Sequence, residues 1–171
     1  ARRRLGLSQK TLAGLLICGT PPMGPGLEDA AAAFLPSAAG AVTTRRDATP
    51  IEIRAYTKAL YGSLDPIPEL FLRAAERTDG PARAAMGEHW AAAEEGCHQR
   101  TVAAGWAGPV CVVHGAQDAF VSGDYLKTIV WRNLWSDCIH EFAGSGHAPF
   151  IEEPALFNEL LHRFVNEACG E

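Results

Sequence analysis

Three short apolar segments, at residues 12–18, 110–114 and 138–142, place the strongest constraint on the fold of this sequence. The first two are almost continuously apolar, as is typical of strands that are buried on both faces of a parallel sheet. The third alternates between apolar and polar residues and then meets a glycine-rich turn, which favours a shorter strand. We therefore predict three strands, of which residues 110–114 are the clearest because three valines follow Pro109.

Helical patterns separate and follow these strands. We expect one helix over residues 122–134 and another over residues 154–168, where apolar positions recur at helical spacing. An order of strand, helix, strand, helix predicts a parallel α/β sheet. Residues 24–108 contain no convincing strand and indicate a helical insertion. Helices are expected there over residues 50–60, 66–77 and 82–95.

Two polar segments follow strands of this sheet. Asp118 lies in the stretch H-G-A-Q-D that begins at His114, and His147 lies in G-S-G-H-A-P after the third strand. Ligands of open parallel sheets bind beyond the carboxyl ends of the strands, so we expect the two side chains to meet there. A carboxylate beside a histidine fixes the imidazole tautomer and stabilises the cation formed when the ring accepts a proton. We predict that Asp118 and His147 lie within hydrogen-bond reach of each other.

These segments resemble the acid and histidine segments of the α/β-hydrolase fold superfamily, which includes esterases, lipases and lactonases. The resemblance rests on H-G-A-Q-D and on G-S-G-H-A-P-F, followed by a helix that opens with E-E-P. It implies the C-terminal part of an α/β-hydrolase parallel sheet with an inserted helical cap. Residues 1–23 and 109–171 would form the partial core, and residues 24–108 the cap or lid. By the same resemblance Asp118 is the acid of a catalytic triad and His147 its general base.

The nucleophile of such hydrolases lies in a G-x-S-x-G elbow on an earlier strand, and that motif does not occur in the 171 residues. We therefore expect the nucleophile upstream of Ala1 and expect this chain alone to be inactive. The implied function is hydrolysis of an ester, lactone or amide carbonyl by a Ser-Asp-His triad. Two alternatives stay open: a haloalkane dehalogenase or epoxide hydrolase with an Asp nucleophile, and a non-catalytic remnant that acts as a binding module.

Four aromatic residues are candidates for substrate binding. Phe120 and Phe150 each lie within three residues of a catalytic position, where they would line an apolar acyl pocket. Tyr56 and Tyr61 lie in the expected cap and resemble the paired cap tyrosines with which epoxide hydrolases donate to a substrate oxygen. Tyrosines on a helix also serve as packing residues, so both roles remain open.

The resemblance implies a small-molecule substrate, and the composition argues against other partners. The formal charge of −5, from 15 Lys and Arg against 20 Asp and Glu, argues against binding to nucleic acid. No run approaches the roughly 18 apolar residues of a membrane span, and the basic and apolar start of the chain fits an export signal poorly. We therefore expect a cytoplasmic protein.

The cysteines and histidines do not have the spacing of metal ligands. Five cysteines form no C-x-x-C pair, which indicates reduced thiols. His114 and His140 lie inside strands and are interpreted as structural residues. No H-E-x-x-H pattern occurs, so we expect neither a metal nor a cofactor.

The first expected strand is a candidate for pairing with another chain segment. In the strand order of the family, residues 12–18 lie between residues 110–114 and a strand of the N-terminal half. The run carries no charge and no proline that would discourage pairing. We expect it to pair with the N-terminal half of the same protein or with a second copy.

Overall fold

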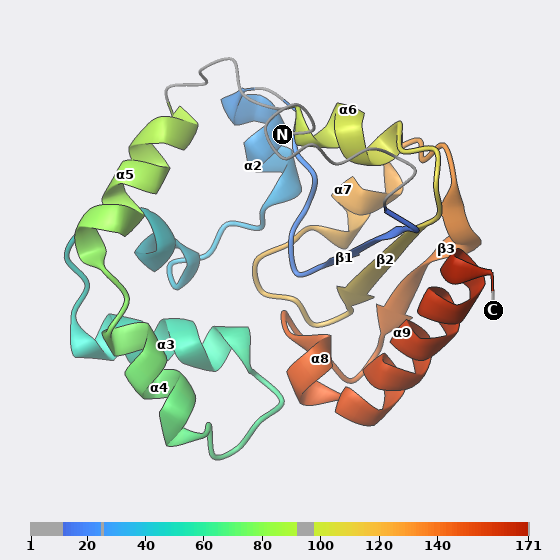
Figure 1. The fold of residues 1–171 in the computed structure, drawn as a ribbon. Coiled ribbons are helices and arrows are strands. Elements are labelled where there is room, and N and C mark those ends of the chain that lie inside the picture. The colour runs from blue at the N-terminus through green and yellow to red at the C-terminus, as the bar shows by residue number, and fades with distance from the viewer. Residues whose placement is uncertain (1–11, 25, 92–97, 171) are drawn as a thin grey trace.

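The computed structural model describes residues 12–24, 26–91 and 98–170, and its centre is a three-stranded parallel sheet (Figure 1). The strands are β1 (Leu15–Cys18), β2 (Val110–Gly115) and β3 (Leu134–Phe142). Strand β2 lies in the middle and pairs in parallel with β1 and with β3. The prediction of a parallel α/β sheet is confirmed, although β1 begins later and β3 begins earlier than the sequence pattern indicated.

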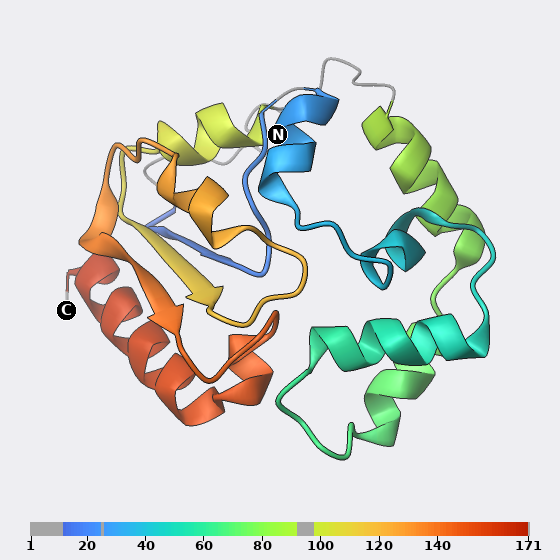
Figure 2. The ribbon, with the colours of Figure 1, turned by 180° about the vertical axis from the view of Figure 1, so that it is seen from behind.

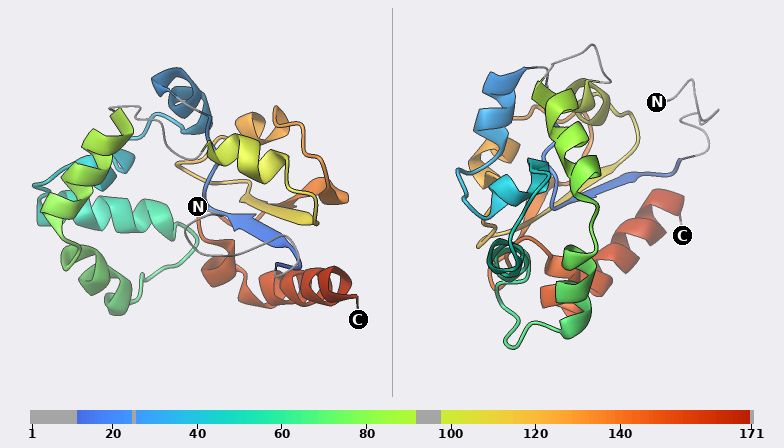
Figure 3. Two further views of the ribbon diagram at one scale, coloured as in Figure 1. Left: turned by 45° about the horizontal axis from the view of Figure 1, so that its top comes forward. Right: turned by 90° about the vertical axis from the view of Figure 1, so that its left-hand side faces the viewer.

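Strand β2 is buried at every position because helices cover both faces of the sheet. Val110 and Val112 pack into a cluster on the side of α7 (Gly123–Lys127). Cys111 and Val113 point the other way, into a cluster with α9 (Pro154–Cys169). Figure 3 shows α9 along one face of the sheet and α6 (Gln99–Ala104) along the other. Two covered faces explain why β2 is continuously apolar rather than alternating.

The helix expected over residues 122–134 is much shorter in the structure. Helix α7 begins after Ser122, whose hydroxyl accepts a hydrogen bond from the Tyr125 N–H, and ends at Lys127. Leu126 and Ile129 are both buried in the cluster on that side of the sheet. The chain must then turn back to enter β3, so the expectation of a continuous helix was wrong.

The C-terminal helix matches the expected range closely. Helix α9 begins at Pro154, a residue suited to the first helical position, and ends before Gly170, which has a left-handed φ of 77°. Its buried residues Phe157, Leu160 and Phe164 lie against the sheet. A short helix, α8 (Pro149–Glu152), connects the His147 loop to α9.

The inserted segment is helical, as expected. It contains α2 (Leu27–Ala33), a 3-10 helix (Gly40–Thr44), α3 (Pro50–Leu60), α4 (Glu69–Glu76), α5 (Gly80–Ala91) and α6. Helix α3 has the predicted bounds because Thr49 and Glu52 form a capping box at its start. Residues 92–95 of the third expected helix lie outside the described residues. Figure 2 shows α3, α4 and α5 to one side of the sheet, whereas α2 lies nearer to it.

The two ends of the insertion are joined at Asp29 of α2. Its carboxylate accepts hydrogen bonds from Arg100 Nη1 at 3.0 Å and from the Gly24 N–H and the Tyr125 hydroxyl, both at 2.5 Å. Arg100 belongs to α6 and Tyr125 to α7. The chain therefore leaves and re-enters the sheet layer at one polar cluster, which anchors the base of the insertion.

Candidate active site

Asp118 lies in the tight turn that follows β2. Its N–H donates to the carbonyl of Gly115, and its Oδ1 accepts from the N–H groups of Phe120 at 2.8 Å and Val121 at 3.1 Å. Two backbone donors on one carboxylate oxygen fix the side chain in the turn. The turn thereby holds the carboxylate at the carboxyl end of the central strand, as the sequence predicted.

His147 lies in the loop that follows β3, and this loop packs directly on the end of β2. The Gln117 N–H donates to the Ser145 carbonyl at 3.0 Å, and a Cβ on Gly115 would overlap the Gly146 carbonyl. A side chain at Gly115 would keep the two loops apart. The glycine therefore permits the approach that brings His147 beside the β2 turn.

The imidazole of His147 contacts Asp118 as predicted. Nδ1 lies 3.1 Å from Oδ1 and 3.0 Å from Oδ2. The Asp118 side chain is 2% exposed and that of His147 is 21% exposed. Because an ionised carboxylate can only accept hydrogen bonds, Nδ1 carries the proton and donates it. The lone pair is then on Nε2, which is the arrangement of a general base.

Hydrogen bonds keep Asp118 ionised. Burial acts to raise the pKa of this carboxyl, but the hydrogen bond and charge of His147 and the N–H donors of Phe120 and Val121 outweigh it. The pKa of Asp118 therefore lies below its usual value. A buried, ionised carboxylate against Nδ1 stabilises the imidazolium that forms when Nε2 accepts a proton.

A cavity of about 360 Å³ opens beside His147. The core contributes Phe120 and His147 to its wall, and the insertion contributes Tyr56 and Leu60 of α3 and Met86 of α5. The ring of Phe120 meets the imidazole edge to face, with ring centroids 5.0 Å apart. The cavity is thus a largely apolar space with a histidine at one end, which suits a small organic ligand.

The four aromatic candidates separate into two pairs. Phe120 and Tyr56 line the cavity, and burial raises the pKa of the Tyr56 hydroxyl, which therefore stays a hydrogen-bond donor. Tyr61 instead stacks on Phe71 of α4, with centroids 4.5 Å apart. Phe150 packs against Phe157 of α9 and is 46% exposed. Tyr61 and Phe150 are not among the residues that line the cavity, so of the two tyrosines only Tyr56 lies in its wall.

Glu152 and Glu153 hold the histidine loop, a role that the sequence alone did not indicate. The hydroxyl of Ser145, a fully buried residue, donates to Glu153. Glu152 accepts from the N–H groups of Gly146 and Ala148, the two residues that flank His147. The signal was present as E-E-P at the start of the last helix, but only the folded loop reveals what the carboxylates bind.

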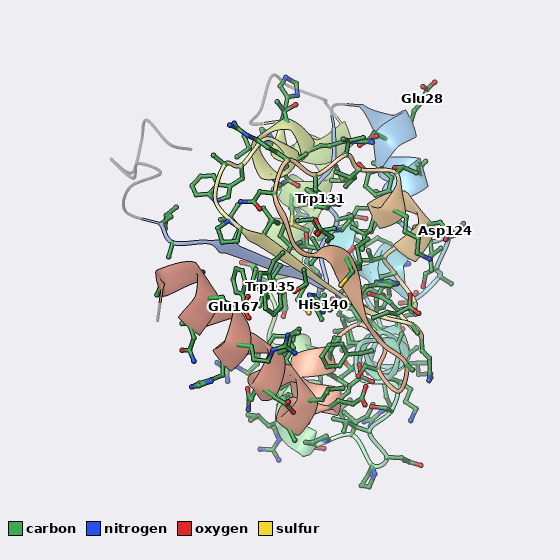
Figure 4. All side chains as sticks on the ribbon, turned by 90° about the vertical axis from the view of Figure 1, so that its right-hand side faces the viewer. Glu28, Asp124, Trp131, Trp135, His140 and Glu167 are labelled. Atoms are coloured by element: carbon green, nitrogen blue, oxygen red, sulfur yellow. The ribbon has the colours of Figure 1, made fainter. Side chains whose placement is uncertain are left out.

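Of the two strand histidines, His114 is buried and His140 is half-buried. Burial lowers the pKa of His114 and of His140, which favours neutral side chains. Figure 4 shows His140 beside Trp135, whose indole N–H donates to Glu167 of α9 at 2.7 Å. These contacts hold β3 against α9 and suit the structural role expected of His140.

The described cysteines are free thiols. Burial, with a smaller effect of nearby charges, raises the pKa of Cys18 to about 11 and that of Cys111 to about 12. Neither is therefore a thiolate nucleophile at neutral pH. Across residues 12–24, 26–91 and 98–170 there is no cluster of three metal-ligating side chains, and no helix has the length and hydrophobicity to cross a membrane.

Solved structures of N-acyl homoserine lactonase AidH match the fold of this chain. A variant of AidH in complex with N-hexanoyl homoserine lactone covers 93% of the chain at 31% sequence identity, with a TM-score of 0.85. The chain belongs to the α/β-hydrolase fold superfamily. It spans 57% of the length of that AidH chain.

Other α/β-hydrolases match in fold. Esterase RhEst1 from Rhodococcus sp. ECU1013 covers 96% of the chain at 20% identity and a TM-score of 0.63, and the chain spans 58% of its length. Esterase EaEST from Exiguobacterium antarcticum covers 91% at 14% identity and a TM-score of 0.66, with 57% of its length spanned. No protein-family model and no curated protein matches the chain. The resemblance to the superfamily is confirmed, and the catalytic roles of Asp118 and His147 stay predictions.

Proposed function

We propose that the chain carries the acid and the general base of a hydrolase that opens an ester or lactone. The contact between the Asp118 carboxylate and His147 Nδ1, at 3.0 Å beside an apolar cavity, is the observation that carries this proposal. The similarity to a lactonase at 31% identity supports the same chemistry.

In the proposed reaction, His147 Nε2 takes the proton of a nucleophilic hydroxyl as the oxygen attacks the substrate carbonyl carbon. The imidazolium, stabilised by Asp118, then gives this proton to the departing alcohol or ring oxygen. Water hydrolyses the acyl enzyme in a second round of the same proton transfers, which regenerates the hydroxyl and releases the acid.

We assign the nucleophile to a segment outside the 171 residues. The sequence contains no G-x-S-x-G, and the hydroxyl of Ser145, the serine nearest to His147 in sequence, donates to Glu153. The two described thiols with raised pKa, Cys18 and Cys111, are poor nucleophiles at neutral pH. We therefore expect the isolated chain to bind ligands without turning them over.

The cavity suggests which substrates to test first. Its apolar wall suits an acyl chain, and the Tyr56 hydroxyl offers a donor to a carbonyl or ring oxygen. AidH structures contain N-hexanoyl homoserine lactone and N-butanoyl homoserine. We propose N-acyl homoserine lactones, and simple esters with acyl chains of similar length, as candidate substrates.

The experiment compares variants of the hydrolase that contains these residues together with its nucleophile. Hydrolysis of N-hexanoyl homoserine lactone and of p-nitrophenyl butyrate is followed in wild type, D118N, H147A and the surface control H162A. D118N should lower kcat by about 10⁴-fold, because an asparagine favours the wrong imidazole tautomer. H162A should stay within about twofold of wild type, since His162 lies on the exposed side of α9.

Two results would oppose the proposal. D118N with more than a tenth of the wild-type kcat would remove the acid from the mechanism. Saturable ester hydrolysis by the isolated 171-residue chain, abolished by H147A, would place the nucleophile inside the chain instead.

A further inference from the structure

Glu152, the last residue of α8, directs its carboxylate back over the histidine loop. Oε1 accepts hydrogen bonds from the Gly146 N–H and the Ala148 N–H, each at 3.0 Å. These two peptide groups lie on either side of His147. One carboxylate oxygen therefore restrains the backbone of His147 from both directions.

The other oxygen of the same carboxylate binds the insertion. Oε2 accepts from the Ser63 N–H at 3.1 Å, across 89 residues of sequence. Ser63 lies in the turn that follows α3, the helix that contributes Tyr56 and Leu60 to the cavity wall. A displacement of this turn would move one end of the cavity wall.

We propose that Glu152 is a positioning residue that couples the position of the turn after α3 to the orientation of His147. Its catalytic consequence rests on the proposed function, whereas the coupling itself is a property of the described residues. Hydrogen bonds to an ionised acceptor are roughly twice as strong as neutral ones, so backbone donors from both loops, with the Ser63 side chain, make one carboxylate an effective link between them.

The neighbouring glutamate shows why this role is specific to Glu152. Glu153 accepts from the Ser145 hydroxyl and so holds the start of the same loop. No hydrogen bond or ion pair recorded in the described part of the chain joins Glu153 to the insertion. Two consecutive carboxylates therefore stabilise the loop, and one of them also binds the turn that follows α3.

The test measures amide hydrogen exchange by NMR in the 171-residue chain, without reliance on turnover. The variants are E152A, E152Q and, as a matched control, E159Q on the exposed side of α9. Exchange is read at Ser63, Gly146 and Ala148 and compared with Leu160 in the core of α9. The low-field Nδ1–H resonance of His147 reports its contact with Asp118.

Each variant has a distinct expected result. E152A should speed exchange at Ser63, Gly146 and Ala148 by about tenfold or more relative to Leu160, and should broaden the His147 resonance. Glutamine keeps one acceptor oxygen, so E152Q should lose protection on one side only, either at Ser63 or at the two loop amides. E159Q should leave all these signals unchanged.

Several outcomes would overturn the proposal. Equal acceleration at Leu160 in E152A would mean that the variant lowers only global stability, which would reduce Glu152 to a structural residue. Unchanged exchange at Ser63 in both variants would remove the link to the insertion. By contrast, loss of protection on both sides in E152Q with unchanged exchange at Leu160 would support the coupling, because it would show that the ionised carboxylate holds both loops. If E152A does not fold, E152Q alone decides between these results.

Failure of the proposed function would appear instead as absence of turnover in the wild-type hydrolase, with the coupling intact.

Discussion

Gly115 and Gly146 meet backbone to backbone where the loop carrying His147 crosses the end of β2. A Cβ on Gly115 would overlap the Gly146 carbonyl and lie 2.6 Å from the Ser145 carbonyl oxygen. Two segments separated by a full strand can approach this closely only because the first has no side chain. The contact between Asp118 and His147 depends on this approach.

Replacing Gly115 with alanine should therefore separate the two loops. We expect G115A to lose about 1 to 3 kcal/mol of unfolding free energy through overpacking, together with the His147 Nδ1–H resonance. Urea denaturation and NMR measure the two effects. G62A is the matched control, because a Cβ on Gly62 has an ordinary 3.7 Å contact with Lys58. A G115A variant with wild-type stability and an intact resonance would contradict this account of the site.

Acidification should weaken the fold partly through Asp118. Burial acts to raise its pKa, but the hydrogen bonds of His147, Phe120 and Val121 outweigh it, so the folded-state pKa lies below the unfolded value. Such a group stabilises the fold above its unfolded pKa of about 3.9 and loses this contribution as the pH falls through the folded value. The unfolding free energy of wild type should therefore fall more steeply than that of D118N below about pH 4.

Urea denaturation at a series of pH values between about 2 and 6 tests this difference. D124N provides the control, because the Asp124 side chain is 96% exposed. D124N should follow the wild-type curve. Equal slopes for wild type and D118N would mean that Asp118 is not held ionised by its partners.

Phe120 and Phe150 should respond differently to truncation. Phe120 is 7% exposed and packs on His147 and Tyr56, so F120A should cost about 3 kcal/mol and weaken binding of N-hexanoyl homoserine lactone. Phe150 is 46% exposed, so F150A should cost less than about 1 kcal/mol and leave binding unchanged. Chemical denaturation and ligand titration by NMR measure both. Equal loss of binding in the two variants would mean that the ligand occupies another surface.

Strand β1 should associate with a further strand. It pairs with β2 along one edge, and no other strand in the described part of the chain pairs with its second edge. An apolar, uncharged edge favours pairing with another copy of itself when no other strand is supplied. Light scattering after size-exclusion chromatography should show a mass that rises with concentration. A monomer at high concentration, with slow amide exchange along β1, would contradict this prediction.

Local sequence patterns determined much of the fold. The continuous apolar run of β2 required two covered faces, and the capping box at Thr49 and Glu52 set the start of α3. The segments around Asp118 and His147 predicted their contact because parallel strands end at a common edge. Each of these features depends on residues close in sequence or on a general rule of sheet topology.

Only the tertiary structure decided which candidate side chains of the site line the cavity and which pack elsewhere. Tyr56 faces the cavity whereas Tyr61 stacks on Phe71, and no periodicity of α3 distinguishes the two. The bond from Ser63 to Glu152 likewise joins residues 89 positions apart. Such contacts depend on the three-dimensional packing of separate elements, and the energy that selects them comes from close fit and paired polar groups rather than from local propensity. The sequence could therefore predict the contact between Asp118 and His147, while packing alone decided which residues surround and hold this pair.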